Sequence, residues 1–359
     1  MPKENETNVS ANSELIIPQM KRIKRNDLTF GRQLGEGEYG VVLMAEAKNI
    51  LPNERSTTVA IKMMRYSDDD TIKKAMLAEL KIIILIGQHL NIVNFLGAVT
   101  ENIDKNELMI VLEYCPYGNV LDFIRSNKAN FVDCSCQTLD VWRKFSKISD
   151  GMTTERKSTR TRFNTKDLIC WSKQIADGMA FLKSKNVCHG DLAARNVLLC
   201  EKNVVKISDF GLARAYNYGG FYKKSGNDRL PYKWLALESM SHQIFNIATD
   251  VWSYGVLLWE LFSLGVAPYP GIPLDDSFYT LLVEGYRMDR PRYATQKIYD
   301  IMCMCWKADP KLRPSFDNLA KMFNAMVPLD LQDHYMSLND PYNDENNECF
   351  NDNNEFENV

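Results

Sequence analysis

Residues 189–196, which read HGDLAARN, constrain the fold and chemistry of this chain more than any other stretch. They place the carboxylate of Asp191 five residues before the amide of Asn196. Such a carboxylate can accept the proton of a hydroxyl group, while the amide oxygen beside it can hold a metal ion. A second hard oxygen ligand, Asp209, opens a DFG tripeptide thirteen residues later. The two motifs therefore predict a metal-assisted reaction on a hydroxyl group.

Both motifs resemble the catalytic loop and the DFG motif of the protein kinases. The wording LAARN is that of the tyrosine kinases, since serine/threonine kinases usually carry lysine where this chain has Ala193. The resemblance implies an α+β fold of two lobes, with a small, mainly β N-lobe that contains one key helix and a larger, mainly α C-lobe. It also implies that Asp191 is the catalytic base, that Arg195 orients it, and that magnesium is held by Asn196 and Asp209.

The composition fits a globular protein and argues against several other classes. The 359 residues are 45% hydrophobic and 25% charged, and a net charge of −3 argues against nucleic acid as the main partner. Nine scattered cysteines, an odd number, fit reduced thiols better than a disulfide framework. The longest apolar runs, 82–86 and 256–259, are too short to cross a bilayer. We expect a soluble, cytoplasmic chain, or one at the cytoplasmic face of the cell membrane if it belongs to a receptor.

Residues 35–40 read GEGEYG and lie between two strand-like stretches. A lone GxGxxG is weak evidence, because dinucleotide-binding folds also use it. In those folds a helix follows the glycines, whereas Val41, Val42 and Leu43 predict a strand here. Glycines in such a hairpin let backbone N–H groups approach phosphate oxygens. The pattern therefore predicts a phosphate-binding flap and argues against a dinucleotide oxidoreductase.

Lys62 ends the apolar strand VAIK, and taken alone it would be a lysine that reaches solvent. Glu79, however, lies within the apolar stripe of a helix predicted over residues 68–86. A carboxylate on a buried face needs a cationic partner, and Lys62 is the natural candidate. The spacing resembles the kinase ion pair that aims this lysine at the phosphates of ATP.

Residues 113–118, EYCPYG, follow a buried strand and contain the proline and glycine of a connector. By resemblance this is the hinge between the lobes, with Leu112 as the gatekeeper behind adenine and Cys115 as a thiol beside the pocket. The resemblance implies an ATP site formed by Leu34, Gly35, Glu36, Gly37, Tyr39, Gly40, Val42, Ala60, Lys62, Leu112, Glu113, Cys115 and Leu198.

Residues 126–165 carry eight basic and four acidic side chains and show no clear period. A long structureless segment inside a compact domain is typical of an insert. Split receptor tyrosine kinases of the platelet-derived and vascular endothelial growth factor receptor type carry an insert at this point, and the hinge wording YCPYGN supports that resemblance. Inserts of that family often present phosphotyrosines, but this one contains no tyrosine.

Residues 209–238 resemble an activation segment, with Tyr222 at the usual position of autophosphorylation. Gly190 replaces the arginine of the usual HRD motif, which in regulated kinases also pairs with the phosphorylated segment. Glycine offers a phosphate neither charge nor donor, so we expect phosphorylation of Tyr222 to activate only modestly. Gly190 is also the only feature that favours the alternative function, a pseudokinase scaffold.

Three further features of the predicted C-lobe extend the resemblance. Residues 231–234, PYKW, resemble the platform that holds the substrate backbone in tyrosine kinases. Glu238 is predicted to pair with Arg313. Asp250 stands in a helix that is apolar nearly all round, and we expect it to hold the catalytic loop from below.

The two ends of the chain differ in composition from the rest. Residues 1–27 are polar and basic near their end, which predicts a flexible segment, either a solvated leader or a juxtamembrane stretch drawn to anionic lipid. Residues 339–359 hold eight Asn and seven acids but no Lys or Arg. Residues 328–359 are therefore predicted to be a disordered tail. Tyr335 and Tyr342 at its start could recruit adaptors that read phosphotyrosine.

The sequence thus predicts a kinase domain over residues 28–327, divided into an N-lobe at 28–112, a hinge at 113–118 and a C-lobe at 119–327. The resemblance implies ATP and magnesium as cofactors and tyrosine-bearing proteins as substrates. It also implies self-association for trans-autophosphorylation, and a place as the intracellular part of a receptor in growth-factor-type signalling.

Overall fold

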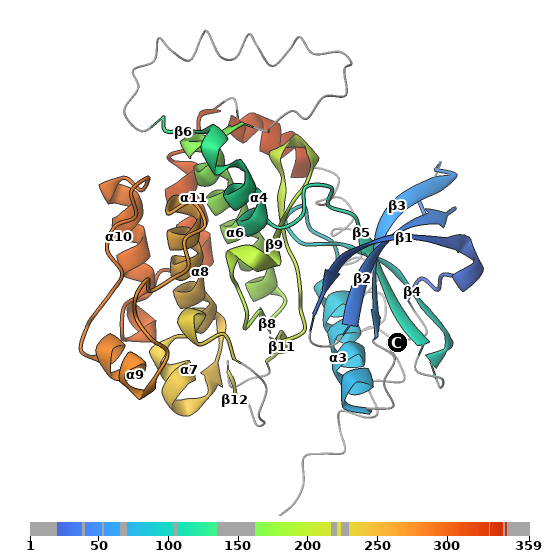
Figure 1. The fold of residues 1–359 in the computed structure, drawn as a ribbon, viewed down its shortest axis with the longest axis horizontal. Helices are drawn as coiled ribbons and strands as arrows, with labels where there is room; N and C mark the ends of the chain where they lie inside the picture. Colours follow the sequence, from blue (N-terminus) through green and yellow to red (C-terminus); the bar gives the residue numbers. More distant parts are fainter. Residues whose placement is uncertain are drawn as a thin grey trace, which may run out of the picture.

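The computed structural model divides the chain into two lobes joined by the segment after β5 (Figure 1). It describes residues 20–37, 40–51, 54–64, 70–103, 107–134, 162–216, 221–223, 230–329, 331–339 and 342. The smaller lobe is mainly strand and the larger one mainly helix, which confirms the predicted α+β fold of two lobes. None of the helices in these ranges combines the length and apolar character that crossing a bilayer requires.

The N-lobe is a five-stranded antiparallel sheet in the order β1-β2-β3-β5-β4. Its strands are β1 (Leu28–Glu36), β2 (Gly40–Lys48), β3 (Ser56–Met64), β4 (Phe95–Asn102) and β5 (Glu107–Glu113). The register sets Val42 opposite Lys62 and Leu112 opposite Ala60. Because Ala60 and Lys62 lie two residues apart on β3, they share one face of the sheet. This face turns toward the C-lobe.

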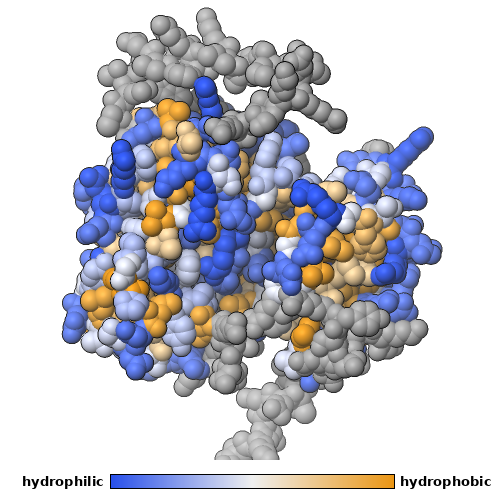
Figure 2. All heavy atoms as spheres, viewed as in Figure 1, coloured by the Kyte–Doolittle hydropathy of each residue, from blue (hydrophilic) through white to orange (hydrophobic). Residues whose placement is uncertain are grey.

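The N-lobe contains one long helix, α3 (Asp70–Ile86), which packs against β3 and β5. Its buried stripe includes Met76, Leu80 and Ile83, which join the large hydrophobic core. On the face shown in Figure 2, polar residues cover much of the C-lobe, whereas apolar residues gather over the N-lobe strands beside the junction of the lobes.

The C-lobe is built around α8 (Ile247–Phe262), in which every residue from 249 to 262 is buried. Burial on all sides explains why its sequence is apolar nearly all round. Asn246 caps this helix by accepting the N–H groups of Ala248 and Thr249. The helices around it are α4 (Val120–Asn127), α6 (Thr165–Ser184), α7 (Leu237–His242), α9 (Asp276–Val283), α10 (Gln296–Cys305) and α11 (Phe316–Asn324).

The C-lobe also contains pairs of short strands. β9 (Val197–Leu199) pairs with β10 (Val205–Ile207), and β8 (Val187–Cys188) pairs with β11 (Arg214–Ala215). β12 (Tyr222–Lys223) pairs with β13 (Ile244–Phe245). These pairs fix the loops between them, where the motifs at residues 189–196 and 209–211 lie.

The described ends of the predicted insert belong to the ordered C-lobe. Residues 126 and 127 complete α4, and β6 (Phe131–Val132) pairs in parallel with β7 (Phe163–Asn164). The predicted lack of structure therefore does not extend to these ends, because aromatic contacts of Phe131 and Phe163 hold them onto the core. Residues 135–161 lie outside the described part of the chain.

The end of the segment predicted to be flexible, residues 20–27, packs along β4. The N–H of Ile23 donates to the carbonyl of Ala98 at 2.9 Å, and the N–H of Ala98 donates to the carbonyl of Lys21 at 3.0 Å. Met20 and Ile23 are buried. The prediction that this stretch is flexible is wrong for residues 20–27, because apolar burial and backbone pairing order them.

The predicted disordered tail contains a helix over residues 331–339, and the prediction is wrong for that part. Tyr335 is 4% exposed and packs with Leu90, Cys170 and Val204. Its hydroxyl donates to the carbonyl of Asn203 at 3.1 Å. A side chain held in this way cannot reach a kinase or an adaptor while the helix is docked. Residues 343–359 lie outside the described part of the chain.

Replacing Tyr335 should therefore loosen this helix. We expect Tyr335→Ala, which removes a buried aromatic ring, to raise hydrogen exchange throughout residues 331–339. Tyr335→Phe removes only the hydroxyl and should cost about 1 kcal/mol of helix docking. Met336→Ala, at a side chain that is 68% exposed, is the matched control and should leave exchange unchanged. Equal exchange in the parent and Tyr335→Ala would contradict the docked helix.

Candidate active site

A cleft of about 530 Å³ opens between the lobes, and residues of both lobes line it. Of the positions predicted to bind ATP, the structure brings together Leu34, Gly35, Glu36, Gly37, Gly40, Val42, Ala60, Lys62, Leu112, Glu113, Cys115 and Leu198. Tyr39 lies outside the described residues. Arg195, Asn196 and Asp209 line the same cleft from the C-lobe, so the predicted nucleotide and metal positions share one cavity.

The glycines of the flap meet two different needs. A Cβ at Gly40 would collide with the carbonyl oxygen of Met63 on the neighbouring strand, so this position requires glycine. At Gly35, by contrast, an added Cβ would meet nothing within 4 Å. The N–H of Gly37 donates to the carbonyl of Gly40 at 2.8 Å, which closes the turn of the flap. The flap thus offers backbone and open space at the mouth of the cleft, a suitable setting for phosphate.

Lys62 and Glu79 form the ion pair that the sequence predicts. Lys62 Nζ lies 2.6 Å and 2.8 Å from the carboxylate oxygens of Glu79, which is only 3% exposed. Nζ also lies 3.2 Å from Oδ1 of Asp209. Burial acts to lower the pKa of Lys62, but the two carboxylates outweigh it and hold its pKa above the ordinary value. Lys62 therefore stays charged at the back of the cleft.

Asp191 is held by Arg195 and Asn196, which follow it in the same motif. Arg195 forms an ion pair with its Oδ1, and Asn196 Nδ2 donates to its Oδ2 at 2.8 Å. Burial raises the pKa of Asp191 to about 6, and Arg195 partly opposes this shift. The carboxylate is thus oriented and made more basic than an exposed aspartate, as a group that accepts a proton requires.

The catalytic loop rests on α8, as predicted for Asp250. Its carboxylate accepts the N–H of His189 at 2.8 Å and the N–H of Gly190 at 2.9 Å. Burial raises the pKa of Asp250 to about 6, and these two N–H groups partly offset that effect. A buried carboxylate that accepts two backbone N–H groups fixes the path of the loop.

Sequence reasoning missed two residues that support the same loop. Glu260 accepts the N–H of Ala194 at 3.0 Å and the indole N–H of Trp234 at 3.0 Å, so it joins the loop to the PYKW segment. His189 contacts the carbonyl of Ser208 through Nε2 at 3.1 Å, and burial lowers its pKa to about 4. A second carboxylate inside the apolar run of α8, besides Asp250, was the signal that could have found Glu260.

The ligands available to a metal ion are the carboxylate of Asp209 and the amide oxygen of Asn196. Both line the cleft. No group of three or more His, Cys, Asp or Glu side chains suited to a metal occurs in the described ranges. Two hard oxygen donors fit magnesium, which usually takes one or two protein ligands and completes its shell with phosphate oxygens and water. Asp209 has a φ of 62°, a left-handed conformation, in which its carboxylate approaches Lys62.

Tyr222 is docked rather than extended from the activation segment. Its ring stacks on Phe245 at 5.3 Å, and its hydroxyl donates to the carbonyl of Leu212 at 3.4 Å. Burial raises the pKa of this hydroxyl. Arg214, in the same segment, donates to the carbonyls of Gly211 and Ala213. Phosphorylation of Tyr222 would therefore require the ring to leave its place on Phe245.

Gly190 is part of this docked arrangement. Its φ is 75°, and a Cβ built there would lie 3.1 Å from the carbonyl oxygen of Leu212 and 3.2 Å from the hydroxyl of Tyr222. An arginine at this position would be strained and would press on Tyr222. The structure thus gives a steric reason for glycine at this position, which the sequence did not reveal.

Gly190→Ala should expose Tyr222. We expect a loss of stability on the order of 1 kcal/mol, from the left-handed backbone, together with faster phosphorylation of Tyr222 by an added tyrosine kinase. Gly87→Ala is the matched control, because Gly87 has a φ of 76° and open space around it. It should lose similar stability without a change at Tyr222. Equal phosphorylation rates in both variants would show that the contact at residue 190 is unimportant.

Two other contacts are present in the C-lobe, and the sequence predicted the first of them. Arg313 donates to Glu238 at 2.6 Å and 2.9 Å, which confirms that pair. The guanidinium of Arg195 lies over the ring of Trp234, with 4.4 Å to its centroid. Trp234 belongs to the PYKW segment, so the segment lies directly beside the residue that pairs with Asp191.

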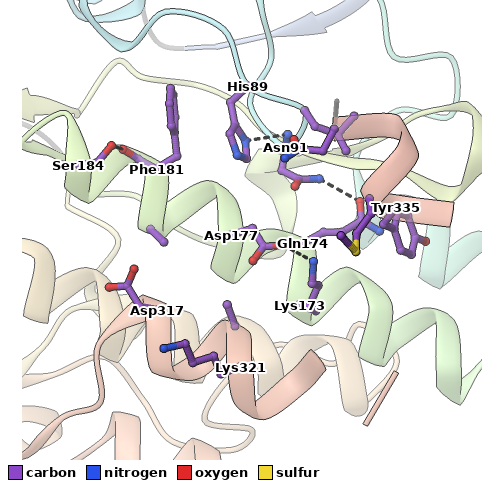
Figure 3. A pocket seen from close by; sticks show the side chains of 15 residues that line it. His89, Asn91, Lys173, Gln174, Asp177, Phe181, Ser184, Asp317, Lys321 and Tyr335 are labelled. Atoms are coloured by element: carbon purple, nitrogen blue, oxygen red, sulfur yellow. Dashed lines mark hydrogen bonds and ion pairs between the residues drawn. The ribbon is translucent and has the colours of Figure 1, made fainter. Parts of the chain in front are cut away.

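A second hollow, of about 510 Å³, lies on α6 away from this chemistry (Figure 3). Its polar groups are partnered with one another: Asn91 donates to Gln174 at 3.0 Å, and Lys173 pairs with Asp177 at 2.7 Å. Its charges are of both signs and largely neutralise each other, so nothing in the hollow points to a particular ligand.

Comparison with known proteins gives one consistent family. The family model described as protein tyrosine and serine/threonine kinase matches residues 28–323. A Mast/stem cell growth factor receptor Kit of Takifugu rubripes is 40% identical over 345 residues, which are 84% of this chain and 35% of that protein. A Vascular endothelial growth factor receptor 3 of Danio rerio is 41% identical over 323 residues, 85% of this chain and 24% of that protein.

A third relative, the Vascular endothelial growth factor receptor 2 of Coturnix japonica, is 39% identical over 86% of this chain and 26% of its own length. The chain thus spans between about a quarter and a third of these relatives. The relatives give no support to the alternative of a scaffold without catalysis.

Proposed function

Because this chain belongs to the protein tyrosine and serine/threonine kinase family, we propose that it transfers the γ-phosphate of ATP to tyrosine hydroxyls. One observation carries the proposal: Lys62, Glu79 and Asp209 are already joined across the cleft, at the same time as Asp191 is oriented below it. A chain that only binds partners would not need these residues from both lobes to be held in position at the same time.

Each group has a defined role in this proposal. Asp191 accepts the proton of the substrate hydroxyl, and Arg195 and Asn196 hold its carboxylate in place. Lys62, kept charged by Glu79, faces the α- and β-phosphates. The main chain of the hinge at residues 113–115 and the apolar side chains that line the cleft receive the adenine ring.

Magnesium is the proposed cofactor, held by Asn196 and Asp209. When bound, it would neutralise charge on the phosphate oxygens. Asp209 is prepared for this role because Lys62, at 3.2 Å, outweighs the effect of burial and holds the pKa of its carboxyl below the ordinary value. It therefore stays an anion near neutral pH.

The preference for tyrosine rests on the segment beside the catalytic loop. Arg195 is fixed twice, by Asp191 and by the ring of Trp234, so it has little freedom to contact a substrate side chain. The exposed Tyr232 of the same segment offers a surface for the substrate backbone. A substrate backbone that lies on this segment, rather than directly on Asp191, favours a long side chain that carries its hydroxyl at the end.

We further propose that this kinase domain, residues 28–327, is the intracellular part of a receptor that acts in growth-factor-type signalling at the cytoplasmic face of the cell membrane. Self-association would bring two domains together for trans-autophosphorylation at Tyr222. Tyr342, which is only partly buried against the cluster that holds Tyr335, is the adaptor site proposed for the C-terminal region. Three receptors among the relatives support this setting.

Product analysis tests the activity directly. The purified chain is incubated with magnesium, labelled ATP and two peptides that differ only in carrying tyrosine or serine. We expect phosphotyrosine, and we expect chelation of magnesium to abolish it. Phosphoserine as the main product would overturn the specificity, and the absence of any product would overturn the proposed function.

A further inference from the structure

Two cysteines from distant parts of the chain lie side by side where the lobes meet. Cys115 belongs to the hinge, and Cys200 follows β9 directly. Sγ of Cys200 donates to Sγ of Cys115 at 2.8 Å, and both are free thiols. A disulfide bond requires two thiols whose sulfur atoms lie close together, and its final S–S length is about 2.05 Å.

The backbone around the two thiols is already paired. The N–H of Leu199 donates to the carbonyl of Gly118 at 2.8 Å, and the N–H of Tyr117 donates to the carbonyl of Leu199 at 3.3 Å. These bonds hold the hinge and the end of β9 against each other. Because a disulfide tolerates only a narrow range of backbone separation, this pairing lets the sulfur atoms join with little movement of the chain.

The two thiols differ in their access to solvent. Cys200 is half-buried, whereas Cys115 is only 6% exposed. The contact with Cys200 and burial both raise the pKa of the Cys115 thiol. The ammonium of Lys206 favours ionisation of Cys115, while Glu113 opposes it. Cys200 is therefore the thiol that a small oxidant meets first, and Cys115 is the one that reacts second.

We propose that Cys115 and Cys200 form a peroxide-sensitive dithiol site, which closes to a disulfide between the hinge and β9. The Cys200 thiol releases its proton, and the thiolate attacks one oxygen of the peroxide. The O–O bond breaks, the sulfur becomes a sulfenic acid, and the departing hydroxide takes up the released proton to leave as water. The Cys115 sulfur then attacks the Cys200 sulfur, the S–O bond breaks, and a second water leaves with the thiol proton. The two sulfurs together lose two electrons, which the peroxide gains, and a thiol reductant reverses the reaction.

The bond would act on the nucleotide cleft. Cys115 lines the cleft, and Leu198, two residues before Cys200, lines it from the C-lobe. A disulfide would tie the segment that connects the lobes to the wall opposite it. We expect turnover to fall on oxidation and to return on reduction, because the lobes must move to admit ATP and release ADP. This consequence rests on the proposed function, whereas formation of the bond does not.

Peptide mapping tests the bond on the full chain. The protein is treated with hydrogen peroxide, its remaining thiols are blocked with N-ethylmaleimide, and peptides are analysed without reduction. We expect a cross-linked pair of peptides that contain Cys115 and Cys200, lost on treatment with dithiothreitol. Cys200→Ser should remove it. Cys303→Ser, at a half-buried free cysteine on α10, is the matched control and should retain it.

Separate alkylation of Cys115 and Cys200 after peroxide treatment would overturn the proposal. Phosphotransfer is measured on the same samples, and Cys200→Ser should keep its turnover in peroxide while the parent loses it reversibly. A cross-link without any difference in turnover would overturn the effect on the cleft and support the site alone. A chain that forms the cross-link but never phosphorylates tyrosine would instead overturn the proposed function.

Discussion

Asp191→Asn should reduce phosphotransfer by about 100-fold to 10,000-fold, the range expected when a general base is lost. The amide has the shape of the carboxylate but accepts protons poorly, so the substrate hydroxyl would lose its acceptor. ATP affinity should change little, because Asp191 is not among the residues that line the nucleotide cleft. Turnover of a tyrosine peptide and binding of a fluorescent ATP analogue measure the two effects separately.

The matched control is Asp177→Asn, which makes the same chemical change beside Lys173 on α6, in the second hollow. It should leave turnover within a few-fold of the parent. Near-normal turnover in Asp191→Asn would exclude Asp191 as the base. A similar loss in both variants would mean that the fall reflects general damage to the C-lobe.

The residues that carry chemistry could be predicted from the sequence because their reasons are local. A carboxylate inside an apolar helical stripe needs a cation, and this alone pointed from Glu79 to Lys62. Asp250 could be assigned for the same reason, as a charge in a helix that is apolar nearly all round. The structure places both where these arguments require.

Other features depend on contacts between distant segments and could not be predicted. The helix over residues 331–339 has little local pattern, and it is held by Tyr335 packing on Leu90 and Val204. Gly190 has a left-handed backbone beside Tyr222, and no sequence period reveals such a contact. The approach of Cys115 to Cys200 likewise depends on how the hinge meets β9. In each case the feature depends on tertiary packing, which the composition of the segment does not predict.

Lys62→Met should abolish phosphotransfer while the chain remains folded. The methionine fills a similar volume but leaves the phosphates without their cation and Glu79 without its partner. Breaking a buried pair costs about 3–5 kcal/mol, so we also expect a clear fall in the free energy of unfolding. Circular dichroism, denaturant unfolding and peptide turnover together measure these effects. Near-normal turnover would refute the role of Lys62.

The pH dependence of this loss identifies its cause. Burial raises the pKa of Glu79, and Lys62 opposes that shift, so removal of Lys62 should raise the pKa further above its unfolded value. The folded chain then binds more protons than the unfolded chain, so this part of the stability is present at low pH and is lost as pH rises above the ordinary pKa of a glutamate. In Lys62→Met with Glu79→Gln the contribution of Glu79 is gone, so the slope should become smaller. What remains of it comes from Asp209, which also loses Lys62. A slope as large in the double variant as in Lys62→Met would show that the unpaired carboxylate of Glu79 is not its cause.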